Sequence, residues 1–163
     1  MTSRLTFHHT TRGRWALSSL VICATLLGGG YWFVTGREPS AASAGHAADE
    51  ACSHVTEQWP SQVGGQQRRA VRGNPTAVAA WGKPAIIARC GVDTPGPTTD
   101  ECIAVNGIDW VGRRLNDGMA FVTYGRSPAV EILVPREYAP EPLLLGAFAE
   151  AAGQIPQGRH TCR

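Results

Sequence analysis

Four cysteines are the residues whose chemistry is most readily inferred from this sequence. They are Cys52, Cys90, Cys102 and Cys162; the fifth cysteine, Cys23, is set aside because it lies in the predicted membrane segment. An even number of cysteines is typical of a disulfide framework in a protein that folds in an oxidising compartment. Cys90 and Cys102 flank a single loop rich in proline and glycine, so their union would close a short ring. We therefore predict the disulfides Cys90–Cys102 and Cys52–Cys162, the second of which would join the two ends of the domain.

Histidines beside two of these cysteines indicate an alternative chemistry. The tripeptides Cys52-Ser53-His54 and His160-Thr161-Cys162 mirror each other. If the ends of the domain meet, two cysteines and two histidines converge, which is a ligand set that zinc uses. The Cys-x-His spacing differs from common zinc motifs, and the expected compartment favours disulfides. We therefore predict no cofactor and keep zinc at Cys52, His54, His160 and Cys162 as the alternative.

An arginine beside an aromatic residue is the candidate ligand contact. Arg126 lies in a predicted turn next to Tyr124. Its guanidinium offers a planar set of donors that matches a carboxylate or a phosphate. With Trp110 on a nearby strand, these three residues form the predicted ligand site. The alternative for Arg126 is a turn residue that pairs with Glu131 or Asp109.

Catalytic motifs are absent from the sequence. It contains no G-x-S-x-G, H-E-x-x-H, Walker A or G-x-G-x-x-G pattern, and these are the patterns that mark common enzyme sites. Asp109 and Glu131 on neighbouring predicted strands could act as paired carboxylates, although solvated strand residues are the commoner case. No catalytic residue is therefore predicted.

A β-hairpin gives the clearest structural signal. Asn106-Gly107 stands between two apolar-rich runs, and a type I′ turn needs two central residues that accept positive φ, as Asn and Gly do. The resulting register sets Ile103 opposite Trp110 on one face. Cys102 then points to the other face.

Further strands and helices follow from apolar patterns and turn residues. Strands are predicted at 85–90, 119–124 and 129–134, and short helices at 51–59 and 75–81. A C-terminal helix from residue 141 carries an apolar stripe with helical spacing, made of Leu144, Phe148, Ala151, Ala152 and Ile155. The strands are too close in sequence for crossover helices. We therefore predict an α+β fold, with a mainly antiparallel sheet of four to five strands and the C-terminal helix packed on one face, preceded by one transmembrane helix.

The N-terminal region predicts membrane attachment. Residues 15–34 carry no charge and include Cys23, and a helix of that length spans about 30 Å, the thickness of the hydrocarbon layer. Arginines precede it, so the positive-inside rule places the N-terminus in the cytoplasm. We predict a cytoplasmic arm (1–14), a transmembrane signal-anchor (15–34), a flexible stalk (35–49) and an extracytoplasmic domain (50–163). The alternative is a signal peptide cleaved after Ala42-Ser43-Ala44.

The charge of the domain argues against nucleic acid as a partner. The chain has a net charge of +2, but residues 37–163 hold 12 of the 15 Lys and Arg and all 13 Asp and Glu, so their balance is 12 − 13 = −1. A near-neutral domain lacks the basic surface that nucleic-acid binding needs.

Several short motifs together resemble one family, the uncharacterised actinobacterial domain-of-unknown-function family 3515. The resemblance runs from about Cys52 to Cys162 and is carried by Trp59-Pro60, Arg68-Arg69, Ala80-Trp81-Gly82-Lys83-Pro84, Arg89-Cys90-Gly91-Val92, Val105-Asn106-Gly107, Asp109-Trp110, Thr123-Tyr124-Gly125-Arg126 and Val134-Pro135. It implies a membrane-anchored or secreted envelope protein and no particular activity.

These observations favour a binding or scaffolding module of the bacterial cell envelope, held at the plasma membrane by a single pass. Its expected partners are the membrane and either another envelope protein or an anionic envelope component. The alternative is an envelope hydrolase or transferase, including a metal-dependent one.

Overall fold

The structure is a computed structural model that describes residues 38–162. The predicted cytoplasmic arm (1–14) and transmembrane segment (15–34) lie outside the described residues. Within 38–162, no helix has the length and apolar character needed to cross a membrane.

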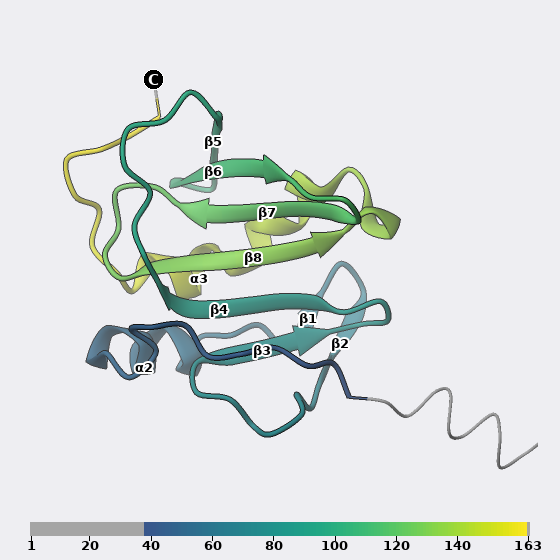
Figure 1. Cartoon of the computed structure of the whole chain (residues 1–163). Coiled ribbons are helices and arrows are strands. Elements are labelled where there is room, and N and C mark those ends of the chain that lie inside the picture. The colour runs from purple at the N-terminus through teal and green to yellow at the C-terminus, as the bar shows by residue number, and fades with distance from the viewer. Residues whose placement is uncertain (1–37, 163) are drawn as a thin grey trace, which may run out of the picture. The chain divides into compact units, whose positions relative to one another are not determined.

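Eight antiparallel strands form one sheet (Figure 1). They are β1 (Gln62–Val63), β2 (Gln66–Arg69), β3 (Val78–Trp81), β4 (Ile86–Val92), β5 (Glu101–Val105), β6 (Ile108–Arg114), β7 (Gly118–Thr123) and β8 (Ala129–Pro135). Their order across the sheet is β1-β2-β3-β4-β8-β7-β6-β5. The predicted α+β fold with four to five strands is therefore wrong, because the domain is mainly an eight-stranded sheet.

The missed strands lack the alternating pattern that reveals a strand. β2 is Gln-Gln-Arg-Arg, and β3 is Val-Ala-Ala-Trp, so the prediction of a helix over 75–81 is wrong. Alanine favours helices locally. The pairing of β3 with β4, from Val78 opposite Arg89 to Trp81 opposite Ile86, overrides that local preference.

The sheet consists of two four-stranded meanders joined at a single strand pair. β1–β4 and β5–β8 each run through consecutive neighbours, and β4 pairs with β8 between them. Residues 93–100 therefore connect β4 near the middle of the sheet with β5 at its far edge. This long connection runs across one side of the sheet (Figure 1).

The predicted hairpin is confirmed. β5 and β6 pair with Ile103 opposite Trp110, and the turn residues Asn106 and Gly107 have φ angles of 49° and 78°. The strands predicted at 85–90, 119–124 and 129–134 are also present, as β4, β7 and β8.

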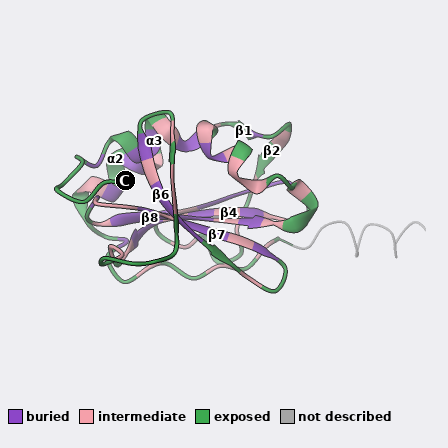
Figure 2. Cartoon of the chain, turned by 90° about the horizontal axis from the view of Figure 1, so that it is seen from above, coloured by how far each residue is buried: buried purple, intermediate pink, exposed green. Residues whose placement is uncertain are grey.

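Helices cover the opposite side of the sheet from the long connection (Figures 1 and 2). α2 (Glu50–Glu57) matches the predicted helix at 51–59. The C-terminal helix is instead a 3₁₀ helix, η3 (Glu141–Phe148), followed by the short α3 (Ala149–Gly153); a second 3₁₀ turn, η2 (Arg136–Tyr138), follows β8. A 3₁₀ helix has three residues per turn, so Leu145 rather than Leu144 is buried in line with Phe148.

Three aromatic rings join these helices to the sheet. Trp59, Trp81 and Phe148 contact one another edge to face, with ring centroids 5.3–6.3 Å apart. Edge-to-face contacts add about 0.5–1.5 kcal/mol each beyond the apolar area they bury. The trio fixes the segment after α2, strand β3 and η3 in one cluster.

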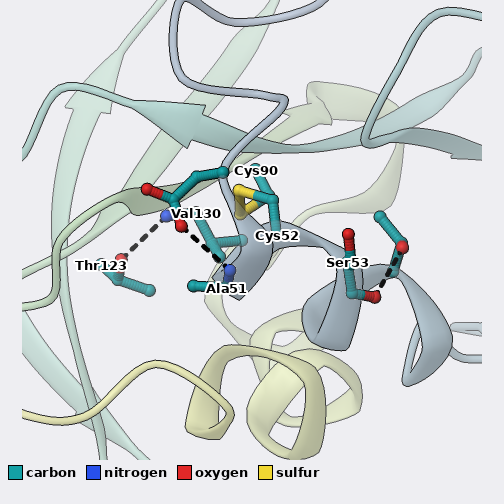
Figure 3. The surroundings of a disulfide bond; sticks show 8 residues. Ala51, Cys52, Ser53, Cys90, Thr123 and Val130 are labelled. Carbon is teal, nitrogen blue, oxygen red and sulfur yellow. Dashed lines mark hydrogen bonds between the residues drawn. A yellow bond between two sulfur atoms is a disulfide. The ribbon is translucent and has the colours of Figure 1, made fainter.

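The disulfides are Cys52–Cys90 and Cys102–Cys162, so the predicted pairing is wrong. β8, β7 and β6 separate β4 from β5, and this keeps Cys90 away from Cys102 even though one loop joins the two strands. Cys90 lies on the face that α2 covers, and it bonds there to Cys52 of α2 (Figure 3).

The predicted stalk is attached to the domain in its described part. The N–H of His46 donates to the carbonyl of Gly91 at 2.9 Å, and the N–H of Arg72 donates to the carbonyl of Pro39 at 2.9 Å. Ala47 is buried. The compact unit therefore begins at Glu38 rather than at residue 50.

The pairing predicts a specific peptide map. Trypsin leaves Cys90 and Cys102 on one peptide, because no Lys or Arg lies between Arg89 and Arg113, so a second cleavage before Asp93 and Asp100 is needed. Under non-reducing conditions the Cys52 peptide should then be linked to Cys90 and the Cys102 peptide to Cys162. A peptide that links Cys52 to Cys162 would contradict the fold.

Gly91 is predicted to be required for docking of the N-terminal segment. It has a φ of 99° at a bulge between Cys90 and Val92, and a Cβ there would lie 2.4 Å from the backbone N of Ala47. Gly91→Ala should therefore lower the free energy of unfolding by about 1–3 kcal/mol in urea denaturation of the full chain. Gly96→Ala is the matched control, because a Cβ at Gly96 meets nothing within 4 Å; equal effects would contradict the prediction.

Candidate ligand-binding furrow

Arg126, the predicted ligand contact, is buried in the structure. Only 6% of the residue is exposed, and its Nη1 donates to the carbonyl of Ile155. Burial lowers the pKa of the Arg126 guanidinium, and the carboxylate of Asp109 opposes this change. Its backbone carbonyl also accepts a hydrogen bond from Thr94 at 2.7 Å. Arg126 therefore holds the C-terminal segment against the β7–β8 turn.

Tyr124 and Trp110 do not form a common site with Arg126. Tyr124 is half-buried and stacks on His160, with ring centroids 5.8 Å apart. Trp110 is fully buried in the core on the helix-covered face. Its indole N–H has no hydrogen-bond partner among residues 38–162. The three predicted ligand residues are thus dispersed between a turn, a surface stack and the core.

The predicted zinc ligands do not converge either. Cys52 and Cys162 belong to different disulfides, His54 is exposed at the end of α2, and His160 stacks on Tyr124. The part of the chain that the structure describes contains no cluster of three or more His, Cys, Asp or Glu residues with metal-binding geometry.

The two carboxylates considered as a catalytic pair have separate partners. Asp109 accepts a hydrogen bond from the backbone N–H of Cys162 at 3.1 Å. Glu131 forms an ion pair with Arg89. Asp109 lies on β6 and Glu131 on β8, with β7 between them, so they are not on neighbouring strands.

The side of the sheet without helices, here called the open face, carries hollows that the sequence did not predict. Strand register shows which side chains share this face, because residues directly opposite in a ladder point the same way. One cross-strand row runs Val111–Val122–Glu131–Arg89, and the next runs Arg113–Ala120–Leu133–Ile87.

Two of these hollows adjoin, and together they are called the furrow. The larger, of about 590 Å³, is lined by 43–45, Arg89, Gly91–Asp93, Pro95, Arg113, Val122 and Glu131. The smaller, of about 310 Å³, is lined by 95–98, Asp100, Val111, Arg113, Ala120 and Val122. The two hollows share Pro95, Arg113 and Val122. Strand residues form the floor of the furrow. The N-terminal segment and the β4–β5 connection form its walls.

Charged groups occupy the floor of the furrow. Glu131 is only 6% exposed, and it accepts a hydrogen bond from Nε of Arg89, whose side chain is 30% exposed. Arg113 is exposed and has no ion pair with any residue in 38–162. The furrow therefore presents one arginine fixed by a buried carboxylate and a second that has no counter-ion among residues 38–162.

A third hollow of about 570 Å³ extends the open face toward the C-terminus. It lies between the β4–β5 connection and the C-terminal tail, and its lining includes Tyr124, Arg159 and His160. The tail is held there by the Cys102–Cys162 disulfide and by close packing on Gly125, whose carbonyl accepts the N–H of Gly158 at 2.7 Å.

The family match extends over most of the chain rather than over the furrow residues alone. The model of a family described as "Protein of unknown function (DUF3515)" matches residues 17–158. The chain belongs to the DUF3515 family. No curated protein and no solved structure matches this DUF3515 chain. The family assignment confirms the resemblance predicted from the motifs, one of which contains Arg89, Cys90 and Gly91.

Sequence reasoning overlooked the furrow because its residues come together only in the sheet. Arg89 and Glu131 are 42 residues apart and belong to different meanders. Each stands at an alternate position of an otherwise apolar strand, which is the one local signal that marks them. That signal does not predict that Arg89 and Glu131 pair with each other.

Arg126 is predicted to stabilise the C-terminal segment. Arg126→Met keeps much of the side-chain volume but leaves the Ile155 carbonyl without its donor, which should cost about 1–3 kcal/mol of stability. Faster amide hydrogen exchange over residues 155–162 should accompany this loss. Arg159→Met is the control, because Arg159 is exposed. Unchanged stability in Arg126→Met would show that the buried guanidinium has no structural role.

Proposed function

We propose that this chain is a binding module of the bacterial cell envelope that acts outside the cytoplasm, with the furrow as its binding surface. The observation that carries the proposal is the pair of arginines, Arg89 and Arg113, on a floor where Glu131 is the other charged group. A rigid sheet with walls made by connecting segments is a common way to build a recognition site. The partner is another envelope protein or an anionic envelope component.

Location outside the cytoplasm is supported by the two disulfides, since such bonds persist mainly in oxidising compartments. Attachment to the plasma membrane is supported by the uncharged segment 15–34 and the arginines before it. In this proposal the segment is a single-pass anchor with the N-terminus in the cytoplasm.

A binding role accounts for the arrangement of side chains better than hydrolysis or group transfer. Catalysis by two carboxylates requires both to reach one substrate, whereas Asp109 and Glu131 lie on strands that β7 separates. Glu131 is also engaged by Arg89. The arginines need only to contact a ligand, which their exposure permits.

A photocrosslinker placed in the furrow should capture the partner in living cells. Thr98 is exposed and lines the furrow, so p-benzoylphenylalanine at position 98 of the full chain should give a light-dependent adduct of defined mass. The same group at Ala147, an exposed position in η3, is the control and should give none.

A blocked furrow distinguishes specific capture from random contact. Val122 lines both hollows of the furrow, so Val122→Trp in the Thr98 crosslinking chain should abolish the adduct by filling that space. The disulfide map of this variant confirms that it is folded. No adduct at position 98, or an adduct that survives Val122→Trp, would contradict the proposed function.

A further inference from the structure

We infer that Arg89 and Arg113 together bind a phosphate or carboxylate group of the ligand, and that an apolar part of the same ligand occupies the adjoining hollow. This inference rests on the proposed function, because it assigns a ligand chemistry to the furrow.

The first step is the orientation of Arg89. Its Nε is engaged by the buried carboxylate of Glu131, and its terminal nitrogens have no hydrogen-bond acceptor among residues 38–162. A guanidinium fixed along one edge keeps donors free on its other edge, in a plane that suits a bidentate oxyanion. Because the side chain is already held, a ligand loses less free energy to its immobilisation.

The second step is the placement of Arg113. It lies on β6, three strands from β4, and adjacent strands are about 4.8 Å apart. Both arginines nevertheless line the same hollow. The residues between them on the intervening strands include Ala120 and Val122, which are short and leave room above the floor. The two long side chains can therefore approach one anion from opposite sides.

The third step is the balance of charge in the larger hollow. Of its two acidic residues, Glu131 pairs with Arg89. Asp93 contacts Nε2 of His46 at 3.2 Å, but its side chain is 95% exposed and therefore lies at the solvent edge of the hollow. The positive charge of Arg113 is not matched within residues 38–162 by any such pair. An incoming anion can therefore pair with Arg113, whereas a cation would meet two guanidinium groups.

The fourth step is the apolar part of the ligand. The smaller hollow shares Arg113 with the larger one, and the rest of its lining includes Pro95, Pro97, Val111, Ala120 and Val122. Its one carboxylate, Asp100, is exposed on the connection rather than on the strand floor. A ligand that combines an anionic group with an adjacent apolar group would fit both hollows at once.

Small aromatic anions test this chemistry directly. Phenyl phosphate and benzoate are titrated into the 15N-labelled full chain, with inorganic phosphate and acetate as counterparts without the apolar part. Saturable shifts of the Arg89 and Arg113 Nε–H signals are expected, with tighter binding for each aromatic anion than for its counterpart. Tighter binding of phenyl phosphate than of benzoate indicates a phosphate ligand, and the reverse indicates a carboxylate ligand.

Arginine variants locate the anion. Arg113→Gln should weaken binding at least about tenfold. A hydrogen bond to a charged group raises the affinity by about that factor or more. Arg89→Lys keeps the charge but loses the planar donors, so it should weaken binding as well. Arg114→Gln is the matched control, because Arg114 is an exposed neighbour that points to the other face of the sheet, and binding should be unchanged.

Glu131→Gln separates orientation from simple charge attraction. This variant makes the furrow more positive, so attraction alone would tighten anion binding. Loss of the carboxylate that holds Arg89 should instead weaken it. The inference is overturned if no anion gives saturable shifts, if Arg114→Gln weakens binding as much as Arg113→Gln does, or if Glu131→Gln tightens it. Crosslinking at position 98 that persists in Arg113→Gln would leave the proposed function standing while removing this ligand chemistry.

Discussion

The pairing of β4 with β8 is the constraint on which the rest of this domain depends. It joins two meanders that are each local in sequence, and it makes the chain between them cross the sheet to reach β5. The same pairing sets Arg89 opposite Glu131, where an ion pair lies on the open face. It also turns Cys90 toward α2 on the covered face. Core, disulfide and furrow all follow from this one register.

The ends of the domain are fixed against glycines that leave no room for a side chain. A Cβ at Gly91 would meet the N-terminal segment, and one at Gly125 would lie 2.0 Å from the carbonyl oxygen of His160. These segments and the β4–β5 connection border the open face. The floor of the furrow is thus held by strand pairing, whereas its N-terminal wall is held by a few backbone contacts such as that of His46 with Gly91.

Two arginines of this domain illustrate how environment separates structure from recognition. Arg126 is buried and gives its donor to the Ile155 carbonyl, so its chemistry is used within the fold. Arg89 is held by a buried carboxylate along one edge only and remains partly exposed. Residue type alone made Arg126 the better candidate, because turns are usually exposed. Burial decided otherwise, since the C-terminal segment folds over that turn.

The sequence by itself determined those features that depend on neighbours in the chain. The Asn106-Gly107 hairpin, α2, three of the strands and the family could be predicted, because turn residues, apolar periodicity and motifs are local signals. The disulfide pairing, the short strands β1–β3, the 3₁₀ geometry of η3 and the furrow were decided only by the tertiary structure. Each depends on which distant segments pack together, and Arg89 carries no mark of Glu131, which lies 42 residues away. The free energy that favours these contacts arises only when the sheet is assembled, so no single stretch of sequence predicts them.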